Sequence, residues 1–183
     1  MRAFVALELP GAVVESLVRF QDELARTGSD LRLVEKENLH FTVKFLGEIS
    51  DSQAAQAAAA LGSLRLKAVD VTVSGAGAFP DARRPRVVWA GVAEEDKRAV
   101  EPLARAVRES LEGIGERDDR PFQAHVTLAR VRSPRNSHEL EALLRENSMR
   151  SFGQARLGEL KLKSSRLTPR GAVYSDIGVF PLG

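Results

Sequence analysis

The chain has 183 residues, of which 27 are basic and 25 acidic, with three histidines and no cysteine. A hydrophobic fraction of 43% is enough to form a core, so the length fits one domain or two small joined lobes. The lack of cysteine excludes disulfides, thiol nucleophiles and cysteine-ligated metal sites, and it suits a reducing cytosol. The formal net charge of +2 does not by itself indicate a nucleic-acid partner.

The amino-terminal stretch MRAFVALELPGAVV differs from a signal peptide, because Glu8 and Pro10 interrupt its apolar run. No apolar run of about 18 residues, the length expected of a membrane-spanning helix, occurs elsewhere in the chain. We therefore expect a cytoplasmic protein that does not contact a membrane, with a monomer as the default oligomeric state.

In the first half of the chain, the expected strands are short apolar or alternating segments, and apolar residues recur every three or four positions in the expected helices. The pattern predicts strands at Arg2 to Leu9, Leu31 to Val34, Leu39 to Leu46 and Val69 to Val73, with helices at Ala12 to Arg26 and after a cap at Ser50 or Asp51.

The second half begins with an expected loop, GAGAFPDARRP at residues 75–85, and continues with a similar alternation of strands and helices. The pattern predicts strands at Arg86 to Val92, Phe122 to Val131, Ala155 to Ser164 and Ala172 to Val179, with helices at Glu94 to Ile114 and after Ser137. The repeated order indicates an α+β protein built from two similar halves.

Two of the three histidines share a local motif. His40 and His125 lie 85 positions apart in strand-like segments, and each is followed two residues later by a threonine, Thr42 and Thr127. Threonine is rare in this chain, at five of 183 residues, so coincidence is a poor explanation for the two pairs. Side chains two apart on a strand point to the same face, so each motif presents an imidazole and a hydroxyl together.

This pairing suits proton transfer at a phosphate. An imidazole gives or takes a proton near neutral pH, and a hydroxyl can donate a hydrogen bond to an anion. Two such pairs facing one cleft would place a phosphate between an acid and a base, with neither a metal ion nor a covalent intermediate. A catalytic zinc site is the weaker alternative, because it usually needs three protein ligands and the sequence has no helical His-x-x-x-His pair. His138 has no partner of this kind and is expected to face solvent on a helix.

The motifs and their surroundings also resemble a known family. The tetrads at residues 40–43 and 125–128 are similar to the paired signature of the two-histidine (2H) phosphoesterases. The flanking sequence resembles one branch of this superfamily, the bacterial and archaeal RNA 2′,3′-cyclic phosphodiesterases, historically called 2′-5′ RNA ligases. The segments that carry this likeness span nearly the whole chain: MRAFVALELP, LHFTVKFLGE, RPRVVWAGV and FQAHVTLARV.

The resemblance implies one two-lobed domain over residues 1–183, in which two pseudo-symmetric lobes, each an antiparallel-rich sheet with flanking helices, enclose the active-site cleft. It implies an enzyme without cofactor or metal that opens an RNA 2′,3′-cyclic phosphate to a 2′-phosphate, and some members join RNA ends in the reverse sense. The expected partners are RNA ends with a cyclic phosphate, and nucleotides. By the same resemblance His40 would donate a proton to the departing 3′ oxygen and His125 would activate water. Thr42 and Thr127 would hold the non-bridging phosphate oxygens.

Other contributors follow from position. Arg130 suits a phosphate oxygen, but strict alternation places it on the face opposite His125, so it needs a bulge or strand end to reach the site. Lys44 shares the parity of His40 and is expected at the rim. Phe4 and Trp89 could stack on a base, although core positions are the simpler expectation for both. The arginines at 83, 84 and 86 could follow an RNA backbone, or simply be solvated.

Two rival functions remain open from the sequence. One is a 2H phosphodiesterase acting on a small cyclic nucleotide or an ADP-ribose cyclic phosphate. The other is a binding module that keeps the cleft without turnover, which predicts tight, salt-sensitive RNA binding and no product.

Overall fold

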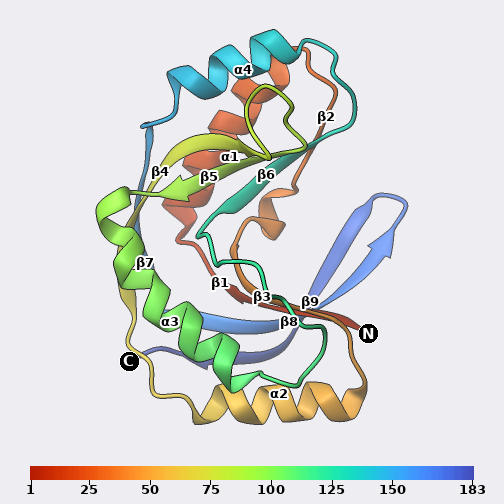
Figure 1. Cartoon of the computed structure of the whole chain (residues 1–183), viewed down its shortest axis with the longest axis vertical. Coiled ribbons are helices and arrows are strands. Elements are labelled where there is room, and N and C mark those ends of the chain that lie inside the picture. Colours follow the sequence, from red (N-terminus) through yellow and green to blue (C-terminus); the bar gives the residue numbers. More distant parts are fainter.

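The computed structural model describes residues 1–183 as nine strands, four α-helices and two short 3₁₀ turns (Figure 1). In chain order the elements are β1 (Arg2–Leu7), α1 (Gly11–Arg26), β2 (Leu31–Leu33), η1 (Lys36–Asn38), β3 (Phe41–Glu48), α2 (Asp51–Ser63), β4 (Val69–Phe79), β5 (Val87–Val92), η2 (Glu94–Asp96), α3 (Lys97–Ser110), β6 (Val126–Val131), α4 (Ser137–Glu146), β7 (Ser151–Leu157), β8 (Glu159–Thr168) and β9 (Gly171–Pro181).

The strands form two antiparallel groups of four that meet at a single residue pair. One group has the order β7-β4-β5-β6 and the other the order β3-β1-β8-β9, while β2 pairs with β6 beside this path. Strands β3 and β6 join the groups through Phe41 and Val126, the one pair recorded between them. Figure 1 shows the groups with helices on their outer sides, which confirms the expected two-lobed α+β fold.

The repeat expected from the sequence is present in the structure. Strand β5 (Val87–Val92) lies 85 positions after β1 (Arg2–Leu7) at both of its ends, which is also the separation of the two histidines. The lobes nevertheless exchange elements, because β4 of the first half pairs with β5 and β7, whereas β8 of the second half pairs with β1. Helices α1 and α4 pack on the β7-β4-β5-β6 group and α2 packs on the other, while α3 contacts β3 of one group and β4 of the other. Each lobe therefore contains both halves of the chain.

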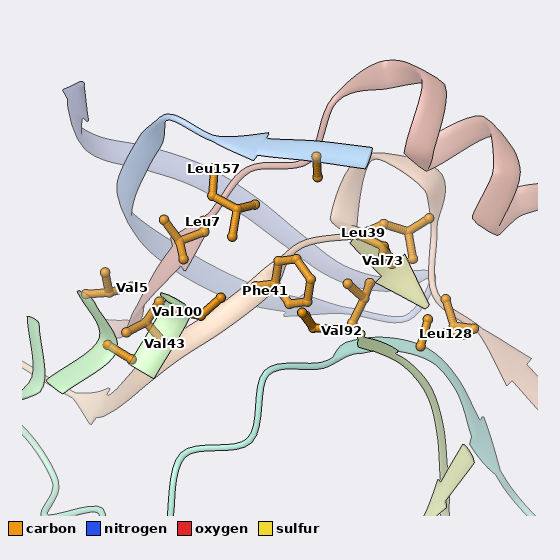
Figure 2. Close-up of a cluster of buried hydrophobic side chains, with 14 of the residues drawn as sticks. Val5, Leu7, Leu39, Phe41, Val43, Val73, Val92, Val100, Leu128 and Leu157 are labelled. Carbon is orange, nitrogen blue, oxygen red and sulfur yellow. The ribbon is translucent and has the colours of Figure 1, made fainter. Parts of the chain in front are cut away.

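One continuous cluster of 37 buried hydrophobic residues forms the core under both lobes. Figure 2 shows part of this cluster, with Phe41 of β3 among valines and leucines from several strands. Phe41 is 1% exposed and Val126 is fully buried. Because strand side chains alternate, burying these two residues turns the positions on either side of each toward the opposite face.

Several element boundaries differ from the sequence prediction. Residues 75–79 of the expected 75–85 loop belong to β4, and those from Ala76 to Phe79 pair with β5. At Gly77 the Trp89 ring lies so close that a Cβ would approach it to 2.4 Å, so glycine is required there for packing rather than for a turn.

The helix expected at 94–114 is shorter in the structure, because it begins with η2 and α3 ends at Ser110. Leu111 follows in a turn and is fully buried, so the apolar spacing of the helix continues past its end. The prediction of a single strand at 155–164 is wrong. Strands β7 and β8 separate there at Gly158 and join different lobes.

The cap predicted at the start of the second helix is present. Ser50 caps α2, accepting a hydrogen bond from the Gln53 amide at 3.1 Å while the Gln53 side chain accepts one from the Ser50 amide at 3.0 Å. This reciprocal arrangement satisfies two backbone donors that a helix start leaves free. None of the helices combines the length and apolar character needed to cross a membrane.

Candidate active site

The join between β3 and β6 brings the two tetrads together. Each histidine directly precedes its strand, and the residue after it, Phe41 or Val126, forms the antiparallel pair. Continuing an antiparallel register by one residue in each direction sets His40 beside Thr127 and His125 beside Thr42. His40, Thr42 and Thr127 line one cavity on the side opposite the buried Phe41–Val126 pair, as the sequence predicted. The same alternation turns His125 toward that side.

A cavity of about 520 Å³ opens at this junction. Its lining includes His40, Thr42, Thr127 and Arg130, whereas His125 lies outside it. The remaining wall comes from β1, the β2–η1 segment, the β8–β9 hairpin and the loop after α3. Volumes of about 300–1,000 Å³ are typical of small-ligand sites, so a nucleotide-sized molecule fits. The cavity extends from the His40 side of the junction.

His40 is held between aromatic rings. It stacks on Phe4, with ring centroids 5.1 Å apart and an interplanar angle of 20°, and meets the edge of Tyr174 at 5.6 Å. Its Nε2 lies 3.1 Å from Thr42 Oγ1, so imidazole and hydroxyl are already in contact. Phe4 is thus both a core residue and part of the site, at 3% exposed.

Burial lowers the pKa of His40 to about 4, because the apolar surroundings disfavour a charged ring. The nearby Glu8 carboxylate opposes this fall in pKa, the Lys163 ammonium adds to it, and a hydrogen bond to the Asn38 backbone opposes it. Lys163 Nζ is itself 3.0 Å from Glu8 Oε1 and 2.9 Å from Asp176 Oδ1. His40 is therefore neutral at pH 7 in the free protein.

His125 is oriented by its own backbone. Its Nδ1 lies 2.7 Å from the Gln123 carbonyl oxygen, and since a carbonyl only accepts, Nδ1 carries the hydrogen. The Nε2 lone pair is then free to take a proton. Burial lowers the pKa of His125, the Gln123 hydrogen bond partly restores it, and the Arg120 charge lowers it further. A neutral imidazole with a free Nε2 has the properties of a general base.

A β-bulge explains how Arg130 reaches the cavity. Trp89 pairs with Thr127 but Val88 pairs with Ala129, so Leu128 is an extra residue in β6. The extra residue shifts the alternation by one position, which turns Arg130 to the same face as Thr127. Arg130 accordingly lines the cavity, as the sequence interpretation required for a phosphate contact.

A second bulge at the equivalent place in β3 corrects the interpretation of Lys44. Ala6 pairs with Thr42 but Val5 pairs with Lys44, so Val43 is the extra residue. Lys44 is consequently turned away from the cavity and is only 7% exposed, so the expectation of a rim lysine was wrong. Phe45, which follows it, lines the cavity instead.

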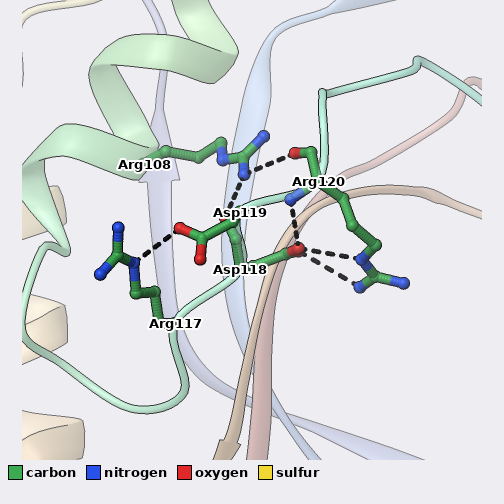
Figure 3. Close-up of polar contacts among 5 residues, drawn as sticks. All are labelled: Arg108, Arg117, Asp118, Asp119 and Arg120. Atoms are coloured by element: carbon green, nitrogen blue, oxygen red, sulfur yellow. Dashed lines mark hydrogen bonds and ion pairs between the residues drawn. The ribbon is translucent and has the colours of Figure 1, made fainter.

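The loop after α3 places one further charge at the site. Figure 3 shows Arg108 donating to the carbonyl oxygens of Asp118 and Arg120, at 2.6 and 2.9 Å, and so fixing the loop to α3. Arg120 Nε is 2.9 Å from Asp118 Oδ1, whereas Arg117 pairs with Asp119. Arg120 lines the cavity and lowers the pKa of His125, so its charge acts on both sides of the junction.

The remaining residues named from the sequence lie away from this centre. Trp89 packs against Phe79, with centroids 5.4 Å apart, and is absent from the cavity wall, as expected of a packing residue. The arginines at 83, 84 and 86 are exposed and do not line the cavity. His138 is exposed on α4, as predicted.

Sequence reasoning missed two aromatic neighbours of the histidines, Tyr174 and Phe79. Tyr174 reaches His40 from β9, and the Phe79 ring meets the His125 ring at 5.0 Å and 89° from the end of β4. Both come from strands supplied by the opposite half of the chain, so no local pattern pointed to them. No three His, Cys, Asp or Glu side chains are grouped in an arrangement suited to a metal ion.

Comparison with known proteins agrees with this geometry. Residues 7–89 and 91–174 each match the family described as LigT like Phosphoesterase, so the family pattern occurs once in each half. The chain is 38% identical over 180 residues to the RNA 2′,3′-cyclic phosphodiesterase of Archaeoglobus fulgidus, covering 98% of this chain and 99% of that protein. It is 35% identical over 184 residues to the protein of the same name from Methanothermobacter thermautotrophicus, covering 100% and 99%.

Solved structures give the same result. TT0787 of Thermus thermophilus superimposes with a TM-score of 0.76 at 33% identity, covering 100% of this chain and 98% of that one. Escherichia coli LigT complexed with 3′-AMP gives a TM-score of 0.77 at 25% identity, covering 99% and 97%. By sequence over nearly its full length, and by a fold that repeats the family pattern in each half, the chain belongs to the LigT-like phosphoesterases.

Proposed function

We propose that the protein hydrolyses RNA 2′,3′-cyclic phosphate ends to 2′-phosphates by general acid–base catalysis, without a metal ion. One observation carries the proposal: the Phe41–Val126 pair sets both His-x-Thr motifs on one face at the edge of a nucleotide-sized cavity. The names of the full-length relatives in Archaeoglobus fulgidus and Methanothermobacter thermautotrophicus support the choice of substrate.

In the proposed reaction, His125 Nε2 removes a proton from water, whose oxygen attacks the phosphorus. The bond from phosphorus to the 3′ oxygen breaks, and His40 donates the proton that the departing oxygen needs. Thr42 and Thr127 donate hydrogen bonds to the non-bridging oxygens, with Arg130 supplying positive charge. Solvent then restores both imidazoles. A 5′-hydroxyl attacking in place of water would join two RNA ends through a 2′–5′ bond.

Two features of the site support these roles. His125 presents a free Nε2, which a base requires. The cavity lies on the His40 side, where the ribose that carries the departing 3′ oxygen must be bound. His40 is neutral in the free protein, so the bound phosphate has to raise its pKa, as a nearby opposite charge does. Binding of the substrate thereby favours protonation of His40, the group that acts as the acid.

The proposal treats residues 1–183 as one functional unit, acting as a cytoplasmic monomer on RNA ends. The test is turnover of an oligonucleotide ending in a 2′,3′-cyclic phosphate, with EDTA present throughout. His40→Ala and His125→Ala should each reduce the rate about 10²- to 10⁴-fold. His138→Ala, on the exposed face of α4, is the control and should retain the wild-type rate. An unchanged substrate, or full activity in both active-site variants, would refute the proposal.

A further inference from the structure

Four arginines of the cavity wall have no carboxylate partner. The wall contains five arginines but only two acidic residues, Glu35 and Glu116. Of the arginines only Arg120 is paired, with Asp118. The other four have no carboxylate oxygen within 4.0 Å, namely Arg2, Arg32, Arg130 and Arg170. A cavity with this excess of unpaired guanidinium groups favours an anionic ligand.

Two of these arginines face each other across a strand pair. Arg32 of β2 is directly paired with Arg130 of β6. Like charges directly opposite one another destabilise a sheet, and no acidic side chain neutralises this pair. An anion bound at the two guanidinium groups would convert this repulsion into favourable contacts.

The β8–β9 hairpin brings a third arginine to the same place. Its tip lies against Arg32, since a Cβ at Gly171 would be 2.9 Å from the Arg32 Nη2 atom. The residue before this glycine is Arg170, which also lines the cavity. Positive groups therefore continue from Arg130, which shares a face with Thr127, to Arg32 on the neighbouring strand and on to Arg170 at the hairpin tip.

We propose that Arg32 and Arg170 form a second anion subsite, which holds the phosphate on the 5′ oxygen of the nucleotide whose cyclic phosphate is opened. This inference rests on the proposed function, which sets the cyclic phosphate between the histidines and the ribose in the cavity. The two phosphates of one nucleotide are separated by its ribose, which matches one subsite at Thr127 and another that lies three residues along β6, at Arg130, and one strand across, at Arg32. The subsite accepts the monoester of a 5′-phosphorylated nucleotide or the diester of an RNA chain.

The subsite is tested by binding, independently of turnover. Calorimetry compares adenosine 2′-monophosphate with adenosine 2′,5′-bisphosphate, and the wild type should bind the bisphosphate about 10- to 100-fold more tightly, as charge-assisted hydrogen bonds allow. Arg32→Gln and Arg170→Gln should each reduce this ratio to within about threefold of unity. Arg26→Gln, which changes another exposed arginine at the end of α1, should leave the ratio unchanged. Equal wild-type affinities, or a ratio that survives both cavity variants, would overturn the subsite.

Turnover then separates this inference from the proposed function. The substrates are a nucleoside 2′,3′-cyclic phosphate, its 5′-phosphorylated form and a dinucleotide ending in the cyclic phosphate. A higher kcat/KM for both phosphorylated substrates supports the subsite, whereas a gain only for the dinucleotide assigns the preference to the second nucleoside and overturns it. Turnover of all three at equal kcat/KM overturns the subsite alone. If none of the three substrates is turned over, the proposed function is refuted. The ratio of the two affinities measured by calorimetry then still tests whether the subsite exists.

Discussion

Replacing His40 with glutamine should remove a pH dependence of stability that this one imidazole creates. The His40 ring stacks on Phe4 and contacts the Tyr174 ring edge-on, and burial lowers the pKa of His40 from 6.5 to about 4. Between these two values the unfolded chain binds a proton that the folded protein does not. Acidification through this range therefore stabilises the unfolded state, and the folded protein loses stability as the pH falls.

The size of the effect follows from the two pKa values. Between pH 7.5 and pH 4.5, a group with a pKa of 6.5 when unfolded and about 4 when folded lowers the free energy of unfolding by about 2.5 kcal/mol. His40→Gln lacks this contribution, whereas the carboxylates titrate alike in both proteins and cancel in the comparison. The wild type's stability relative to His40→Gln should therefore fall by about 2.5 kcal/mol on going to the lower pH.

Urea unfolding at pH 7.5 and 4.5, followed by circular dichroism, measures this difference. His138→Gln is the matched control, because that imidazole is exposed on α4. Its difference from the wild type should be nearly the same at both pH values. If the difference between wild type and His40→Gln also stays constant within about 0.5 kcal/mol, His40 is not a buried neutral imidazole and the reasoning is wrong.

Three further predictions concern single side chains. Arg120→Gln should raise the pKa of His125 in an NMR titration, because the Arg120 charge lowers that pKa, and should raise KM, because Arg120 lines the cavity. Arg117→Gln in the same loop should change neither the pKa nor KM. Thr127→Val should lower kcat/KM about tenfold or more in steady-state assays, because a phosphate oxygen loses its hydroxyl donor. Ser50→Ala should reduce the free energy of unfolding by about 1 kcal/mol in urea titrations without altering turnover, since only the α2 cap is lost.

The repeat and the two motifs could be predicted because their signals are local. His40 and Thr42 have the period of a strand, and the same spacing returns 85 residues later at His125 and Thr127. Alternation of side chains then correctly placed His40 and Thr42 on one face, where the two side chains are in contact. Which residues would surround the pairs was beyond a local pattern.

Strict alternation fails where the regular strand geometry is interrupted, which is why Lys44 was misplaced and why Arg130 needed a bulge to reach the site. Bulges at Val43 and Leu128 shift the alternation, so Arg130 enters the cavity and Lys44 leaves it. A bulge depends on the neighbouring strand's register, which a single strand's sequence does not contain. Tyr174 is a second example, because it reaches His40 only after β9 pairs with β8 and β8 with β1.

The position of the product phosphate tests the central claim most directly. An oligonucleotide ending in a 2′,3′-cyclic phosphate is incubated with the protein and EDTA in ¹⁸O-labelled water, and the product is identified by mass spectrometry and ³¹P NMR. Water attack with departure of the 3′ oxygen predicts a 2′-phosphate that contains one ¹⁸O atom and a free 3′-hydroxyl. A 3′-phosphate, or substrate recovered unchanged, would contradict the roles given to His40 and His125.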